Sequence, residues 1–142
     1  MENPSDARVG QVLRSAQRIA IVGLSSKPDR PSYNIARYML DHGYEIVPVN
    51  PNEDEVFGRP AYARLTDIPG PIDIVNVFRR KSGVPDAVLG TIAIGAPTLW
   101  LQLGVIHEDA AAAAAAAGLT VVVDRCILVE HARLVIHGAM IA

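Results

Sequence analysis

A short loop after the first apolar run concentrates groups that could bind an anion. It reads "GLSSKPDRPSYN" and begins at Gly23, which lets the backbone turn and lets a ligand approach it. Ser25 and Ser26 supply hydroxyl groups, and Lys27 and Arg30 supply positive charge. Hydroxyls, backbone N–H groups and cations together bind phosphate, so the loop predicts a phosphate site. A solvated loop without a ligand is the alternative that the composition leaves open.

Ser32, in the same loop, can cap the helix that follows, and a helix N-terminus favours an anion through its free N–H groups and its dipole. The dinucleotide fingerprint G-x-G-x-x-G is missing, because Gly23 is the only glycine between Ile19 and His42. The spacing therefore predicts a phosphate site built differently from the usual NAD-binding turn.

The residues after the second apolar run indicate the kind of nucleotide. Proteins that bind NAD usually carry an Asp or Glu at this strand end, which bonds the ribose hydroxyls. Here the residue is Asn50, followed by Pro51. A neutral amide weakens the NAD interpretation and suits a ribose that carries a phosphate, which a carboxylate would repel. Asn-Pro is also a common turn, so a purely structural role stays open.

Two further strand ends carry side chains suited to a ligand. Phe78 and Arg79 end the third run within the basic sequence "FRRK", and arginine matches a phosphate with two parallel hydrogen bonds, although a charge run is often only a solvated face. Gln102 and Gly104 follow the fourth run, where an amide can bind a ligand or close the loop. Trp100 lies inside that run and is expected in the core.

The sequence predicts neither a catalytic residue nor a metal site. Cys126 is the only cysteine, and His131, five residues later, does not complete a set of nucleophile, base and oxyanion site. His42, His107 and His137 show no metal-ligand spacing with each other or with the cysteine.

Five apolar runs rich in β-branched residues predict the strands that position these sites. Their nearly continuous hydrophobicity is typical of strands covered on both faces, and the helical patterns between most of them predict a parallel sheet with right-handed crossovers. The expected strands are 19–23, 45–50, 72–78, 98–102 and 119–124, and the expected helices are 32–42, 84–94 and 107–117, after an N-terminal helix over 3–17 capped by Asn3 or Ser5.

The expected fold class is α/β, a three-layer Rossmann-like fold with a mainly parallel sheet of five strands in the order 3-2-1-4-5. The segment 61–65 predicts a short strand or a helical turn, and the C-terminal tail is ambiguous between a helix and a final strand, so a sixth strand is open. In this order the sheet reverses between the first and fourth strands, and a ligand is expected at the carboxyl ends there.

Length and composition predict one domain in a reducing compartment. The chain has 142 residues, which we divide into an N-terminal helix (1–17), a core (18–131) and a tail (132–142). A single cysteine and an acidic N-terminus without an apolar stretch predict a cytoplasmic protein with no signal peptide. The net charge of −2 predicts no nucleic-acid partner, and the uncharged run 87–106 is too interrupted by glycine and proline to predict a membrane span.

Six motifs follow one another along the chain: "VGLSSKPDRPSYNIARYM", "GYEIVPVNP", "FGRPAY", "DIVNVFRR", "LWLQLGV" and "VVDRCILVEH". Together they resemble the small stand-alone CoA-binding domain family, similar to the N-terminal domain of the succinyl-CoA synthetase alpha subunit. The resemblance covers about 18–131 and implies a Rossmann-type domain that binds coenzyme A. Its motif positions fall on Gly23, Ser25, Ser26, Ser32, Asn50, Pro51, Phe78, Arg79, Gln102 and Gly104.

The phosphohistidine of the synthetase lies in a second domain, which 142 residues are too few to include, so we interpret "IHGAM", with His137, as a chance likeness. The resemblance implies no known reaction for stand-alone members. The leading hypothesis is a module that binds CoA or an acyl-CoA as a small-molecule ligand without catalysis of its own. The alternatives are a component of a CoA ligase or transferase that acts with a partner chain, thiol chemistry at Cys126, and a module that senses an NAD(P)-type nucleotide.

Overall fold

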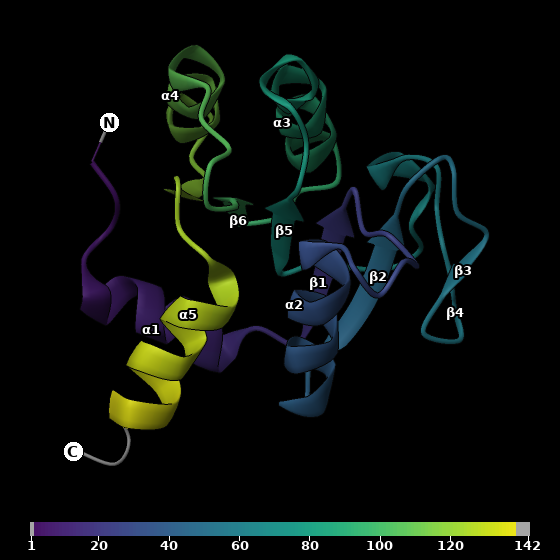
Figure 1. Ribbon diagram of the computed structural model, residues 1–142. Coiled ribbons are helices and arrows are strands. Elements are labelled where there is room, and N and C mark those ends of the chain that lie inside the picture. Colours follow the sequence, from purple (N-terminus) through teal and green to yellow (C-terminus); the bar gives the residue numbers. More distant parts are fainter. Residues whose placement is uncertain (1, 139–142) are drawn as a thin grey trace.

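A five-stranded parallel sheet forms the middle layer of the computed structural model, which describes residues 2–138 (Figure 1). Its strands fall within one or two residues of the expected runs, because β-branched stretches mark strands locally. They are β1 (Arg18–Val22), β2 (Glu45–Val49), β5 (Ile74–Val77), β6 (Thr98–Leu101) and β7 (Thr120–Val122). A separate antiparallel hairpin consists of β3 (Glu55–Val56) and β4 (Arg59–Pro60).

The order of the strands corrects the expectation from the sequence. The sheet runs β2-β1-β5-β6-β7, so the five expected strands lie in the order 2-1-3-4-5 rather than 3-2-1-4-5. The reversal therefore lies between β1 and β5. The outer side of β2 is occupied instead by Tyr62, which forms an isolated parallel bridge to Val49 and exchanges backbone hydrogen bonds with Pro48 and Asn50. The third expected strand, β5, pairs with the other side of β1.

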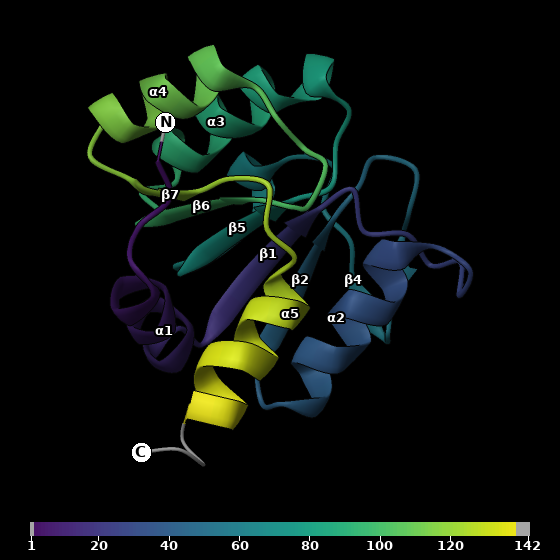
Figure 2. The same ribbon diagram turned by 60° about the vertical axis from the view of Figure 1, so that its left-hand side comes forward.

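Helices cover both faces of the sheet (Figure 2). One face carries α1 (Asp6–Ser15), α2 (Pro31–Asp41) and α5 (Ile127–His131), which a π-helical segment (Ala132–His137) continues, so the described part of the ambiguous tail is helical. The other face carries α3 (Val84–Ala93) and α4 (Glu108–Ala116). Two 3-10 turns, η1 (Leu65–Asp67) and η2 (Lys81–Gly83), lie in the connections on either side of β5.

The core divides into two clusters because successive strand residues point to opposite faces. Ile19 and Ile21 of β1 face α1, α2 and α5, whereas Ala20 and Val22 face α3 and α4. Trp100 is fully buried as expected, and its indole N–H donates to the carbonyl of Arg125 at 2.9 Å. The alanine run of α4 supplies small buried side chains, which let that helix lie close to the sheet: Ala110, Ala111 and Ala114.

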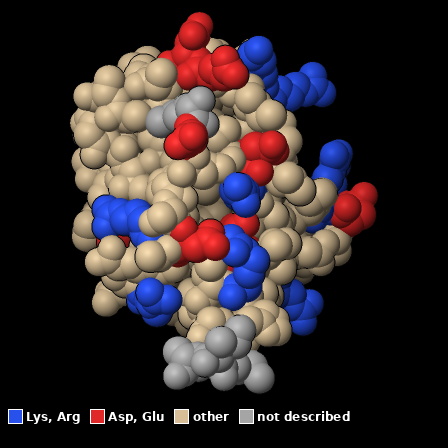
Figure 3. Space-filling view, turned by 90° about the vertical axis from the view of Figure 1, so that its left-hand side faces the viewer, with Lys and Arg blue, Asp and Glu red and all other residues tan. Residues whose placement is uncertain are grey.

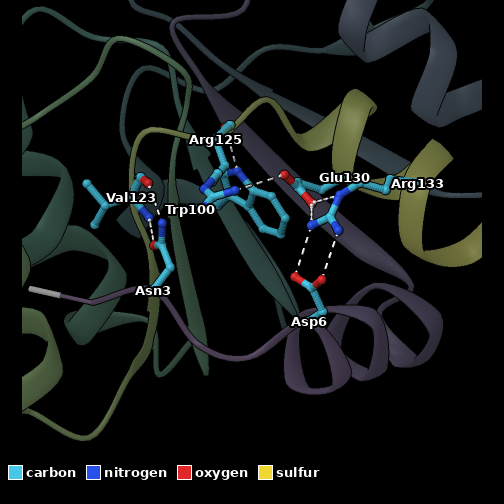
Figure 4. Close-up of polar contacts among 7 residues, drawn as sticks. All are labelled: Asn3, Asp6, Trp100, Val123, Arg125, Glu130 and Arg133. Atoms are coloured by element: carbon cyan, nitrogen blue, oxygen red, sulfur yellow. Dashed lines mark hydrogen bonds and ion pairs between the residues drawn. The ribbon is translucent and has the colours of Figure 1, made fainter.

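The two ends of the described chain are held together by polar contacts (Figure 4). Arg133 binds the carboxylates of both Asp6 and Glu130, and this guanidinium holds the pKa of Asp6 below its ordinary value. The cap of α1 is Ser5. The amide of Asn3, the other candidate, instead exchanges two hydrogen bonds with the backbone of Val123 after β7. The N-terminal segment is thereby fixed against α5 and the end of the sheet.

Charged side chains on the face shown in Figure 3 are interspersed rather than gathered by sign. This face therefore offers no broad surface of one charge among the residues drawn in colour. Within residues 2–138, no helix has the length and apolar character that a membrane crossing needs.

We expect Gly23→Ala to destabilise the fold by roughly 2–5 kcal/mol. Gly23 has a φ of +89°, and a Cβ there would overlap the carbonyl oxygen of Phe78 at the end of β5. Gly43→Ala is the matched control, since Gly43 has a φ of +93° but open space around it, and should cost only about 1–2 kcal/mol. Urea unfolding measures both losses, and equal losses would contradict a steric role for the close approach.

Stability should fall as the pH drops below about 6.5. Burial and the nearby His42 lower the pKa of His131, whose Nδ1 pairs with the Tyr38 hydroxyl at 2.9 Å. The unfolded chain therefore binds the proton more tightly than the folded chain, and folding is penalised once the unfolded histidine protonates. Urea midpoints between pH 7.5 and 5 should show a weaker slope in His131→Gln than in the exposed-site control His137→Gln. Parallel slopes would assign the pH dependence elsewhere.

Candidate functional site

The loop after β1 and the turn after β2 enclose a hollow of about 490 Å³, here called the loop hollow. Eight of the twelve residues predicted from the sequence line it, so the carboxyl ends of the strands do bring them together. These eight are Gly23, Ser25, Ser26, Lys27, Arg30, Ser32, Asn50 and Phe78, and three residues not predicted, Pro31, Asn52 and Glu53, line it as well.

The prediction that Ser32 caps α2 is wrong, because the Ser32 hydroxyl instead binds the backbone of the loop. Helix α2 begins at Pro31, with Arg30 at the cap position and no capping side chain. Proline suits the first helical position because its fixed φ is already helical, so the helix starts one residue earlier than expected. Ser32 then lies in the first turn, where its buried hydroxyl accepts a hydrogen bond from the N–H of Ser25 at 3.1 Å.

Asn50 joins the loop to the turn that follows β2. Its Nδ2 donates to the carbonyl of Leu24 at 3.1 Å, and its Oδ1 accepts from the N–H of Asn52 at 2.9 Å. The turn role that the sequence left open is therefore present, and the same residue also lines the loop hollow.

Glu53 is the acidic residue of the loop hollow that the sequence did not predict. Its carboxylate accepts hydrogen bonds from the N–H of Ser26 at 2.6 Å and from the Ser26 hydroxyl at 2.9 Å. The acids of "PVNPNEDE" signal a charged turn, but the sequence does not indicate which of them points inward. The loop hollow thus contains one carboxylate beside the cations Lys27 and Arg30.

A second hollow of about 520 Å³, here called the α3 hollow, lies between α3 and the segment 63–66, which runs into η1. Arg79 lines it together with Arg64, so the structure separates Arg79 from the loop residues. Its floor is apolar and includes Leu65 and Ala87. Consecutive residues at three strand ends line the two hollows, with Val22, Val49 and Arg79 in the α3 hollow and Gly23, Asn50 and Phe78 in the loop hollow.

The remaining predicted residues do not line either hollow. Gln102 is buried, and its Oε1 accepts from Asn76 Nδ2 at 3.2 Å and from the N–H of Ile127 at 3.3 Å. The N–H of Gly104 donates to the carboxylate of Asp124 at 2.7 Å. Pro51 is exposed on the turn after β2. Gln102 and Gly104 therefore support the start of α5 and the loop after β6.

The thiol and the histidines lie away from both hollows. Cys126 is half-buried at the cap position of α5, and His131 is engaged with Tyr38 of α2. Within residues 2–138, no group of three or more His, Cys, Asp or Glu side chains is arranged to hold a metal ion.

Comparisons with known proteins agree with this architecture. A family model described as a CoA binding domain matches residues 17–132. The uncharacterized protein YneT of Bacillus subtilis is 46% identical over 132 residues, 93% of this chain and 98% of that protein. The alpha subunit of ADP-forming acetate–CoA ligase II from Pyrococcus furiosus is 31% identical over 72 residues, 50% of this chain but only 16% of that subunit. A solved hypothetical protein from Pyrococcus horikoshii is 36% identical, with a TM-score of 0.89 over 94% of this chain and 99% of that one.

Ser32→Ala should loosen the loop and cost about 1–3 kcal/mol, because the N–H of Ser25 loses its acceptor. Amide hydrogen exchange should become faster at Ser25 and its neighbours. Ser82→Ala, an exposed serine in η2, is the control and should leave the exchange of the loop unchanged. Unaltered exchange at Ser25 in Ser32→Ala would contradict the bond's role in holding the loop.

Proposed function

This chain belongs to the CoA binding domain family, and on that premise we propose that it binds coenzyme A or an acyl-CoA across the carboxyl ends of β1, β2 and β5. The observation that carries the proposal is the pair of hollows that adjoin at these strand ends. CoA is a long molecule with a diphosphate, a phosphorylated ribose, an adenine and an uncharged pantetheine arm. Such a ligand needs anion contacts and an extended path, and two adjoining hollows offer both.

The loop hollow supplies the anion contacts for a diphosphate. Ser25 and Ser26 carry hydroxyls there, and Lys27 and Arg30 line the same space. Helix α2 begins at this point, so its positive dipole end lies beside the loop. The eight predicted residues that line this hollow are our assignment for this part of the ligand.

The α3 hollow combines an apolar floor with two arginines, Arg64 and Arg79, and one acid, Asp86. An adenine ring or a pantetheine arm suits the apolar floor, and a ribose phosphate suits the guanidinium groups. We assign Arg79 to the ribose phosphate. Asn50, at the boundary between the two hollows, carries no charge that would repel this phosphate.

A binding role without catalysis is the simplest fit to these groups. Among the described residues, neither hollow is lined by a cysteine or a histidine that could act as nucleophile or base. The likeness to part of an acetate–CoA ligase subunit favours a second candidate, a component of a CoA ligase that acts with a partner chain. Turnover of an acyl-CoA by the purified chain alone would overturn the first proposal, and stable co-purification with a second subunit would favour the other.

Calorimetric titration with CoA, dephospho-CoA, NAD and NADP tests the ligand. We expect saturable binding of CoA, and binding of NAD without CoA would contradict the proposal.

Arg79→Ala should weaken CoA binding by about tenfold and leave dephospho-CoA binding nearly unchanged, because only CoA carries the ribose phosphate. Arg80→Ala, an exposed neighbour that lines neither hollow, is the matched control and should alter neither affinity much. Titration calorimetry gives the four dissociation constants. Equal losses for both ligands in Arg79→Ala would place this side chain at the diphosphate or in the fold instead.

A further inference from the structure

One of three consecutive acids is turned into the loop hollow. Asp54 and Glu55 are exposed, whereas Glu53 is half-buried and directs both carboxylate oxygens at Ser26. The backbone N–H and the hydroxyl of Ser26 are the two donors, at 2.6 and 2.9 Å. A carboxylate therefore accepts from the same loop that carries Lys27 and lines the predicted phosphate site.

The turn after β2 is built to hold Glu53 in this position. The carbonyl of Asn50 accepts a hydrogen bond from the N–H of Glu53 at 3.2 Å, and the Asn50 side chain binds the N–H of Asn52. The same side chain reaches the carbonyl of Leu24 in the loop. Asn50 thus bonds both the loop that carries Ser26 and the turn that carries Glu53.

Ser26 is the residue of the loop whose N–H and hydroxyl donate to an anionic group, the Glu53 carboxylate. The neighbouring N–H groups are bonded to neutral oxygens: Gly23 to the carbonyl of Val49, Ser25 to the Ser32 hydroxyl and Lys27 to the Ser25 hydroxyl. Carboxylate and phosphate oxygens accept from the same N–H and O–H donors in charge-assisted bonds. The Glu53 carboxylate therefore marks a position that a phosphate oxygen of a ligand would take.

We propose that Glu53 is a built-in competitor for the phosphate site. Its carboxylate must leave Ser26 before a ligand phosphate can bind there, so it lowers the affinity for anions and selects for ligands that bring enough charge and further contacts to displace it. The proposal rests on the proposed function, in which the loop hollow receives a diphosphate.

The test compares Glu53→Gln with Glu55→Gln, which makes the same change at an exposed acid of the same turn. The probes are CoA and inorganic pyrophosphate, titrated into the full chain by calorimetry. Glu53→Gln should bind both probes about five- to tenfold more tightly than the wild type, because a charged acceptor is replaced by a neutral one. Glu55→Gln removes the same charge without the contact and should tighten binding by less than about twofold.

Ser26→Ala provides the second arm. It should weaken pyrophosphate binding, and adding Glu53→Gln to it should give a smaller gain than with Ser26 present, because the hydroxyl donor is lost while the backbone N–H of residue 26 remains. Without any ligand, the amide of Ser26 should exchange its hydrogen faster in Glu53→Gln than in the wild type, because its carboxylate acceptor is gone.

The outcomes separate this proposal from the proposed function. If Glu53→Gln binds both probes no more tightly than Glu55→Gln does, the proposal that Glu53 is a competitor is wrong, even if CoA binds well. Weaker binding also overturns it and makes Glu53 a ligand contact. A Glu53→Gln chain that gains pyrophosphate affinity but binds no CoA supports the competitor and contradicts the CoA function. If pyrophosphate binds to none of the variants, the proposal that Glu53 is a competitor is wrong.

Discussion

The approach of two backbones at the ends of β1 and β5 is the constraint on which the rest of the structure depends. The N–H of Phe78 donates to the carbonyl of Val22, the N–H of Gly23 donates to the carbonyl of Val49, and no Cβ fits at Gly23. With these strands so close, the loop after β1 leaves directly above the strand ends. The two hollows then open on either side of the same three ends, which is the arrangement that a long ligand would need.

The site is held by the same side chains that line it. Ser32 and Asn50 bind backbone groups of the loop, and Glu53 binds Ser26. These contacts give hydrogen-bond partners to backbone polar groups of the loop, which would otherwise have few partners where the loop leaves a buried strand. Substitutions in this hollow will therefore alter both the shape of the loop and its affinity, so controls matched in chemistry and exposure are needed to tell the two effects apart.

Local patterns predicted the elements well, and long-range geometry explains what they missed. The β-branched runs and glycine caps located the strands and helices, since both signals act within a few residues. The strand order depends on pairing between distant segments: the sequence predicted a short strand or a helical turn over 61–65, but it did not indicate that Tyr62 pairs with the outer side of β2. Gln102 was predicted as a ligand contact at a strand end, but its side chain is buried and accepts a hydrogen bond from Asn76 on the adjacent strand. Glu53 was missed because its direction depends on the turn that Asn50 forms.

The segment that pairs with the outer side of β2 also affects whether the edge of the sheet can pair with another chain. An outermost strand with free N–H and C=O groups is a template for pairing with another chain. Here Tyr62 already engages Pro48 and Asn50, and Pro48, as a proline, has no N–H to offer. At the other end of the sheet, β7 is only three residues long. Both borders of the sheet thus offer few free backbone groups to another chain, which is an arrangement that disfavours edge-to-edge aggregation.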